Sequence, residues 1–312
     1  MQLYDGTAPV AAERCAAALG FFDGVHLGHR AVIAAADRWA AEHAAETAVF
    51  TFDLPLGSRV KAGGRLLSDD EKHRRLASVG VRHCVQPPFE AFRGLSPEQF
   101  VDELLVGVCH AKAVFCGDNF TFGKNKAGTA RLLVQLCAQR GIEAHILPMA
   151  QYEGQPVSST RIRAALAEGK IEQVNAMLGE DYCIDFPVRH GRQLGRTLGF
   201  PTINQIYPAG MQMPKSGVYI TQVMLEDGSL HPGATGLGSR PTVGGEEITC
   251  ETFLPGFSGQ LYGSRVRLRF CRWLKPTVKF DTLAQLTDYV SGAADAALAW
   301  FGGQSKTGEA NH

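Results

Sequence analysis

The feature that most constrains the fold is the alternation of apolar segments with helix-like segments through the first half of the chain. Apolar runs such as TAVFTF (47–52) and AKAVFCG (111–117) are separated by stretches with helical spacing, among them the Ala-rich stretch from Leu27 to about His43. Strands that alternate with helices form a parallel sheet whose two faces are both covered. The sequence therefore predicts a doubly wound α/β domain over residues 1–182.

After about residue 183 the pattern changes. Gly and Pro recur every few residues up to about Phe280, and short segments such as SGVYITQVML alternate in polarity. This pattern is typical of a small antiparallel barrel or sandwich. The later stretch TLAQLTDYVSGAADAALAWF returns to helical spacing, so we expect a closing helix. We place a second, all-β domain at 183–302 and expect a disordered tail at 303–312.

The composition limits the class of partner. Lys plus Arg (31) balance Asp plus Glu (31), so no overall charge favours nucleic acid or an anionic membrane. The opening MQLYDGTAPVAAERC has no cationic stretch leading into an apolar one, and no apolar run approaches the roughly 18 residues needed to cross a bilayer. The eight Cys are scattered without a C-x-x-C pair. We expect a cytoplasmic protein with reduced, buried cysteines that acts on small molecules, either alone or as a weak homo-oligomer.

The segment GFFDGVHLGHR (20–30) places two His three residues apart in the first turn of a predicted helix that follows a strand. Both imidazoles of His26 and His29 then face the same way. A helix N-terminus attracts phosphate, and the nearby Gly20, Gly24 and Gly28 would let phosphates approach the backbone. We interpret the segment as a polyphosphate site. A metal-binding His pair and two structural His are the alternatives.

The segment VSSTRIR (157–163) also begins a predicted helix. Ser159 and Thr160 can cap this helix, and Arg163 points back across its first turn. Together with the His segment, it could bring a second helix N-terminus and a guanidinium to one triphosphate. Taken alone, the segment is equally well explained as an N-cap followed by a solvated basic face.

A loop in the second half, GRQLGRTLGFPTIN (191–204), gathers small residues and oxygen donors. The Thr202 hydroxyl and the Asn204 carbonyl could share Mg²⁺ with nucleotide phosphates, because Mg²⁺ prefers oxygen ligands. The alternative is a turn in which Asn204 bonds only its own backbone. Downstream, Glu251 stands beside Phe253 and Leu254 and could accept a proton from a hydroxyl, or it could be a solvated strand carboxylate without a role.

Three segments resemble motifs of a known enzyme family. GFFDGVHLGHR, CGDNFTFGKNKAGT (116–129) and VSSTRIR together resemble the adenylyltransferase half of bacterial bifunctional riboflavin kinase/FAD synthetases. The resemblance implies an HxGH nucleotidyltransferase fold with His26 and His29 as catalytic residues on the ATP phosphates. It implies further ATP-binding residues at Gly20, Phe22, Asp23, Gly24, Gly28, Ser159, Thr160 and Arg163, and flavin-binding residues at Asp118, Asn119 and Phe120.

The second half resembles the riboflavin kinase half of the same family through PTIN, SGVYI, GLGSRPT, CETFLPGF and LYG, in that order. This resemblance implies a six-stranded antiparallel barrel in which Thr202 and Asn204 bind Mg²⁺, Gly199 and Pro201 bind ATP, and Glu251 activates the riboflavin hydroxyl. The implied function is phosphorylation of riboflavin to FMN and then adenylylation of FMN to FAD, with ATP as co-substrate, Mg²⁺ as cofactor and flavins as substrate and product.

The sequence departs from the family pattern in places. TFDLPLGSRV stands where the family has a His-Pro pair after its TF motif, so the resemblance does not carry flavin binding over to Asp53 and Pro55. Gly236 and Lys275 replace an Asn and an Arg of the family pattern. Lys does not replace a bidentate Arg contact. Two other functions therefore stay open: a nucleotidyltransferase for another phosphorylated acceptor, and a flavin-binding regulator with one inactive half.

Overall fold

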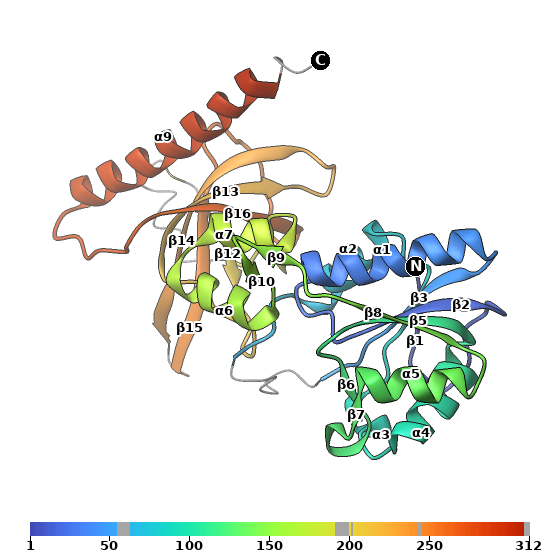
Figure 1. Cartoon of the computed structure of the whole chain (residues 1–312). Helices are drawn as coiled ribbons and strands as arrows, with labels where there is room; N and C mark the ends of the chain where they lie inside the picture. Colours follow the sequence, from blue (N-terminus) through green and yellow to red (C-terminus); the bar gives the residue numbers. More distant parts are fainter. Residues whose placement is uncertain (55–62, 191–199, 201, 243–244, 309–312) are drawn as a thin grey trace. The chain divides into compact units, whose positions relative to one another are not determined.

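The computed structural model describes residues 1–54, 63–190, 200, 202–242 and 245–308. The chain divides into two compact units, Met1–Ser58 with Asp69–Ser159 and Arg59–Ser68 with Thr160–His312. Figure 1 shows the elements of both. No helix in these described ranges is long and apolar enough to cross a membrane.

The first unit contains a six-stranded sheet in the order β1-β4-β3-β2-β5-β8, and every pair in it is parallel. Its strands are β1 (Gln2–Tyr4), β2 (Cys15–Leu19), β3 (Glu46–Phe50), β4 (His83–Val85), β5 (Ala111–Gly117) and β8 (Glu143–Leu147). Its helices are α1 (Leu27–Glu42), α2 (Asp69–Ser78), α3 (Phe89–Phe92), α4 (Pro97–Gln99), the π-helix η1 (Phe100–Val108), the 3₁₀ turn η2 (Lys124–Lys126) and α5 (Ala130–Ala138). Two short hairpins pair β6 (Thr121–Phe122) with β7 (Gly128–Thr129) and β9 (Gln151–Tyr152) with β10 (Gln155–Pro156).

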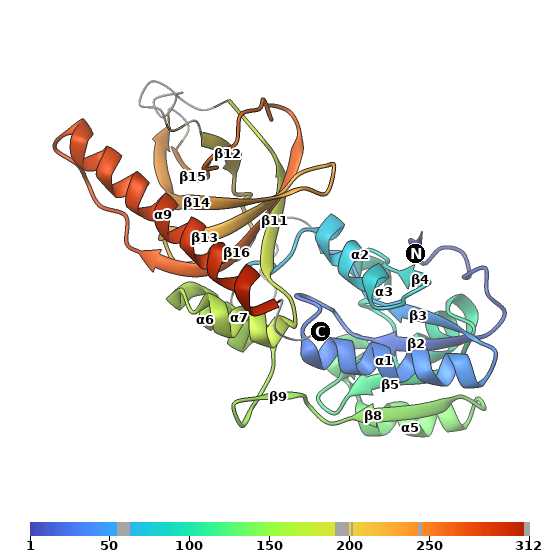
Figure 2. The same cartoon turned by 90° about the horizontal axis from the view of Figure 1, so that it is seen from above.

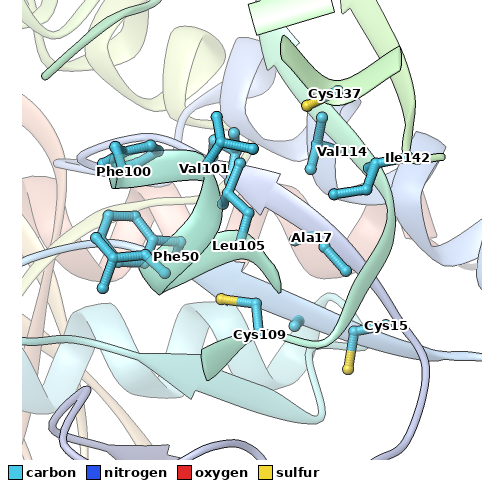
Figure 3. Packing of buried hydrophobic residues seen from close by; sticks show 14 of the residues in the cluster. Cys15, Ala17, Phe50, Phe100, Val101, Leu105, Cys109, Val114, Cys137 and Ile142 are labelled. Carbon is cyan, nitrogen blue, oxygen red and sulfur yellow. The ribbon is translucent and has the colours of Figure 1, made fainter. Parts of the chain in front are cut away.

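The helices of this unit lie on both faces of the sheet, as the strand and helix alternation predicts. In Figure 1, α1 and α2 cover one face, and α3, α4 and α5 lie on the other. The helix α4 begins with a reciprocal capping box formed by the Ser96 side chain and the Gln99 side chain. One core cluster fills the space between the sheet and the helices η1 and α5. Figure 3 shows Phe50, Phe100 and Leu105 within it.

The cysteines are part of these cores. All eight are free thiols, and all except Cys271 are buried. Burial raises the pKa of Cys137 to about 11 and that of Cys15 to about 12, so these thiols stay protonated and unreactive at neutral pH. The prediction of buried cysteines holds for seven of the eight, and Cys271 is half-buried.

The second unit contains a curled six-stranded antiparallel sheet in the order β11-β16-β13-β14-β15-β12. Its elements are α6 (Ser159–Glu168), α7 (Ile171–Leu178), β11 (Tyr182–Pro187), β12 (Thr202–Ile206), β13 (Gly217–Met224), β14 (Leu230–Thr242), β15 (Gly245–Phe253), β16 (Arg265–Lys275) and α9 (Leu283–Gly308). A bridge between Arg189 and Asn204 links the chain after β11 to the opposite edge strand β12. The predicted barrel-type domain with a closing helix is confirmed, and Figure 2 shows α9 running along it.

The contacts group α6 and α7 with this second sheet, whereas the sequence division at residue 182 assigns them to the first domain. Asn175 joins α7 to the sheet, because it accepts from the Tyr182 amide at 2.8 Å and donates to the Phe270 carbonyl at 2.9 Å, and the Lys215 amide donates to the Leu166 carbonyl of α6 at 3.0 Å. At the other end, α9 continues to Gly308, into the stretch for which the sequence predicted a disordered tail.

Residues 63–68 also pack in the second unit, although they precede α2 of the first unit in the chain. Arg65 bridges to Met211 in parallel, with its amide donating to the Gly210 carbonyl at 2.9 Å. A Cβ at Gly64 would lie 2.3 Å from the Met211 carbonyl carbon, so only glycine fits there. Leu66 and Leu67 are buried.

Candidate functional site

The strand order of the first sheet shows where a ligand is expected to bind. From β2, the strands β3 and β4 follow toward one edge, whereas β5 and β8 follow toward the other. In open α/β sheets, ligands bind outside the carboxyl ends of the strands at the point where the order reverses. The segments that follow β2 and β5 are the His-containing turn and Gly117–Asp118–Asn119, so two of the predicted binding segments meet this point of the fold.

The turn after β2 has an unusual backbone. Phe22 has φ of 53° and Val25 has φ of 45°, and Gly24 between them has φ of 96°. Left-handed conformations are unfavourable for bulky and β-branched residues, and such strain concentrates at functional sites. Phe22, Val25 and Asp23 are buried, so packing holds the turn in place. Ser159, the last residue of this unit, also holds the turn in place, because its hydroxyl donates to the Asp23 carbonyl at 2.9 Å.

The two imidazoles lie together, as their spacing predicts. Their rings are stacked with centroids 3.6 Å apart and planes 15° apart. His26 is the N-cap of α1, and its Nδ1 accepts from the His29 amide at 3.4 Å. A Cβ at Gly28 would lie only 3.2 Å from Cε1 of His26, so the absence of a side chain there makes room for the stacked pair.

The protonation of His29 follows from its surroundings. Burial comes first, and the charges of His26 and Lys72 add to it; together they hold the pKa of His29 well below its usual range. Its Nδ1 is buried and has no hydrogen-bond partner among the described residues. Within that part of the chain no group of three or more His, Cys, Asp or Glu side chains could hold a metal ion. A neutral His29 keeps one ring N–H that can donate to a phosphate oxygen.

The predicted ATP-binding residues at the start of α6 belong to different units. Ser159 belongs to the first unit, whereas Thr160 and Arg163 belong to the second. Thr160 is exposed. Arg163 is buried, and its Nε donates to the Gly64 carbonyl at 2.7 Å. The predicted role of Arg163 on the triphosphate remains a prediction.

The predicted flavin-binding residues follow β5 directly. Asp118 and Asn119 are exposed, and Phe120 is half-buried and stacks on Phe122 with ring centroids 5.8 Å apart. The Asp118 amide donates to the Leu147 carbonyl at 3.1 Å, and Asn119 Nδ2 contacts the Met149 sulfur at 3.8 Å. These contacts leave the Asp118 and Asn119 side chains accessible at the carboxyl end of β5.

Sequence reasoning missed two residues near the His turn, Thr51 and Lys72. Lys72 is buried, and its Nζ donates to Thr51 Oγ1 at 2.7 Å; Thr51 in turn donates to the Phe21 carbonyl at 2.9 Å. The available signal was the position of Lys72 on the same helix face as the buried Leu76, where an apolar residue is expected.

In the second unit, three predicted kinase residues come together. Asn204 of β12 lies directly opposite Glu251 of β15, and Gly236 of β14 pairs with Glu251 from the other side. Side chains alternate along a strand, and directly paired residues point to the same face. Thr202, Asn204 and Glu251 therefore share one face of the sheet. Their hydroxyl, amide and carboxylate oxygens are the donor types that Mg²⁺ prefers.

The bonds of Asn204 show that the turn interpretation also has a basis. Asn204 Nδ2 donates to the Thr202 carbonyl at 3.5 Å, and this leaves its side-chain oxygen out of that bond. Gly199 and Pro201 lie outside the described residues, as does Pro55. Asp53 bonds through its backbone to Pro87 and Phe89, and Lys275 donates to the Tyr289 carbonyl at 3.0 Å.

A stacked His pair at the switch point of a parallel sheet and an oxygen-rich face on an antiparallel barrel define two phosphate-transferring domains in one chain. Two family models match these halves: FAD synthetase over residues 8–161 and riboflavin kinase over residues 178–301.

Curated relatives match nearly the whole chain. The bifunctional riboflavin kinase/FMN adenylyltransferase of Listeria monocytogenes is 34% identical over 270 residues, which cover 85% of each chain. The Haemophilus influenzae protein of the same name is 32% identical and covers 92% of this chain and 94% of the relative. The chain belongs to the family of bifunctional riboflavin kinases/FMN adenylyltransferases, and it is a transferase with both activities.

A solved structure supports the fold over its full length. A Streptococcus pneumoniae protein described as a macrolide-efflux protein superposes with a TM-score of 0.83 at 26% identity, covering 94% of this chain and 98% of its own. Of the three functions that the sequence left open, these comparisons support the bifunctional enzyme.

Proposed function

We propose that the two activities use separate sites within the chain: riboflavin is phosphorylated on the face that carries Thr202, Asn204 and Glu251, and FMN is adenylylated at the turn that carries His26 and His29. The observation that carries this proposal is that each residue set is assembled within one unit, the first by strand register and the second by ring stacking.

In the kinase step, Glu251 accepts the proton of the riboflavin 5′-hydroxyl as its oxygen attacks the γ-phosphorus of ATP. The bond from that phosphorus to the bridging oxygen breaks, and ADP leaves. Thr202 and Asn204 would hold Mg²⁺ through their oxygens, and the bound ion supplies charge that neutralises the phosphates. Glu251 is half-buried beside Asn204, which suits a proton acceptor close to the nucleotide.

In the adenylyl step, a phosphate oxygen of FMN attacks the α-phosphorus of ATP, and the bond to the β-phosphate oxygen breaks to release pyrophosphate. The attacking phosphate is already a nucleophile, so the protein aligns the reactants and stabilises the charge of the leaving group. His26, His29 and the amides at the start of α1 act on the phosphates. Asp118, Asn119 and Phe120, exposed or half-buried after β5, contact the flavin.

The proposal includes the cellular compartment in which the enzyme works and the class of molecule on which it acts. Buried, protonated thiols and a net charge of zero support work in the cytoplasm on small molecules, without nucleic acid.

Two substitutions test the separation of the sites. Glu251→Gln should lower FMN formation by about 10²–10⁴-fold, the usual range for a proton acceptor, while FAD formation from supplied FMN persists. His29→Ala should lower FAD formation by about 10²–10³-fold and leave FMN formation unchanged. Chromatographic time courses of riboflavin, FMN and FAD measure both. Equal losses of both activities in either variant would contradict separate sites.

A further inference from the structure

Lys72 is a buried cation behind the turn that carries the His pair. It lies on α2, only 5% exposed, in the same unit as the turn. Its Nζ bonds Thr51 Oγ1 at 2.7 Å and lies 5.3 Å from the centroid of the Phe21 ring. Removing an ammonium group from water costs several kcal/mol unless other interactions compensate. Packing alone would therefore favour an apolar side chain at this position.

The bonds from Lys72 lead directly to the turn. Thr51 is fully buried just after β3, and its hydroxyl, which accepts from Lys72, donates to the Phe21 carbonyl at 2.9 Å. Phe21 precedes Phe22, whose left-handed backbone opens the turn. The lysine, the threonine and the carbonyl thus form one continuous chain of hydrogen bonds that ends at the first residues of the strained segment.

We propose that Lys72 is a positioning residue for adenylyl transfer: through Thr51 and the Phe21 carbonyl it fixes the turn that presents His26 and His29. The inference rests on the proposed role of the His pair in binding the ATP phosphates.

The geometry of His29 supports the neutral form. Its Nδ1 is buried with no hydrogen-bond partner in the described part of the chain, so a proton there would have no acceptor. In the neutral ring the single proton is then on Nε2, where it can donate to a phosphate oxygen. After burial and His26, the charge of Lys72 is a further cause that lowers the pKa of His29.

Further titratable and charged groups lie on the elements that carry His29 and Lys72. His26 stacks on it and, like Lys72, lowers its pKa after the larger effect of burial. Asp23 is buried in the turn, and Arg30 donates through Nε to the Val25 carbonyl at 3.1 Å. On α2, the carboxylate of Glu71 bonds Arg74 and Arg75. On β4, burial raises the pKa of Cys84 to about 11 although Lys72 opposes that rise.

The test separates the mechanical link from the charge. Lys72→Met removes the charge but keeps the length of the side chain, Lys72→Arg keeps the charge, and Thr51→Val removes the linking hydroxyl. Lys112→Met is the matched control, because Lys112 is exposed on β5. Each full-length variant is assayed for FMN adenylylation and for riboflavin phosphorylation. The His29 imidazole is titrated by NMR, with His29→Ala used to assign its signal.

Lys72→Met should lower kcat/KM for adenylylation by at least about tenfold, as expected when a hydrogen bond to a charged group is lost. It should also move the His29 titration and the acid limb of the adenylylation pH profile to higher pH, while phosphorylation stays within twofold. Lys72→Arg should return the titration toward that of the unaltered enzyme. Thr51→Val should lower adenylylation and leave the titration in place, because the cation remains.

The outcomes distinguish this inference from the site assignment. If His29→Ala retains adenylylation, the proposed nucleotide site itself is wrong. If His29→Ala loses it, but Lys72→Met keeps the original kcat/KM and the original titration, only the role of Lys72 is refuted. Should Lys72→Met fail to fold, Thr51→Val decides: unchanged adenylylation in a folded Thr51→Val enzyme would overturn the positioning role.

Discussion

Gly28→Ala should lower adenylylation, because the stacked His pair leaves no space for a methyl group. Gly28 lies in the first turn of α1, where alanine favours the helix by up to about 1 kcal/mol over glycine. The new Cβ, however, would lie 3.2 Å from Cε1 and 3.3 Å from Nδ1 of the His26 ring. Ordinary van der Waals contact needs about 3.5–4.0 Å, so the ring must move by a few tenths of an ångström.

That displacement sets the size of the expected effect. A misplacement of about 1 Å can cost about 10²-fold in rate, so a few tenths of an ångström should lower adenylylation by roughly threefold to tenfold. The assay is kcat/KM for FAD formation from supplied FMN, together with the thermal midpoint and the rate of riboflavin phosphorylation. Gly292→Ala in α9 is the control, because a Cβ there meets nothing within 4 Å. It should gain helix stability without changing adenylylation. A Gly28→Ala enzyme with unchanged adenylylation would refute the reasoning about the stacked pair.

Two further predictions concern ionisable groups. Burial raises the pKa of Glu71, but bonds to Arg74 and the neighbouring Arg75 outweigh it and lower the pKa to about 2. The carboxylate therefore contributes up to about 3 kcal/mol of stability, fully present above about pH 4.5 and lost as the pH falls toward 2. Thermal midpoints between pH 6 and pH 2 should fall less steeply in Glu71→Gln than in the unaltered protein; parallel slopes would contradict this. The buried thiols should resist a thiol reagent in the native state, with the half-buried Cys271 labelled first by mass spectrometry; rapid labelling of Cys109 without unfolding would oppose the prediction.

The parts of the fold that could be predicted are those that short-range patterns encode. Spacing alone places His26 and His29 on one side of a helix start, and alternating polarity predicts the antiparallel second unit. Both follow from the geometry of single elements. The resemblance of short motifs then names the family, which the comparisons confirm.

The parts that could not be predicted depend on contacts between distant segments. The pairing of Asn204 with Glu251 is a matter of strand register, which no local propensity specifies across two separate strands. The bond between Lys72 and Thr51 requires knowing which helix covers the end of β3. The grouping of α7 with the second sheet involves the bonds from Asn175 to Tyr182 and Phe270. Such tertiary contacts override what the chain order suggests.

The packing of residues 63–68 in the second unit affects how the protein folds during synthesis. Neither unit is a continuous length of chain, because a stretch made early during synthesis belongs to the unit that is completed late. While the ribosome is still producing the first 159 residues, the unit to which Leu66 and Leu67 belong is incomplete, and the Arg65 backbone lacks its Gly210 and Gln212 partners. The segment 63–68 therefore reaches its final contacts only after the carboxyl-terminal half has emerged, and a fragment expressed from residue 160 onward would have to fold without the bridge from Arg65 to Met211.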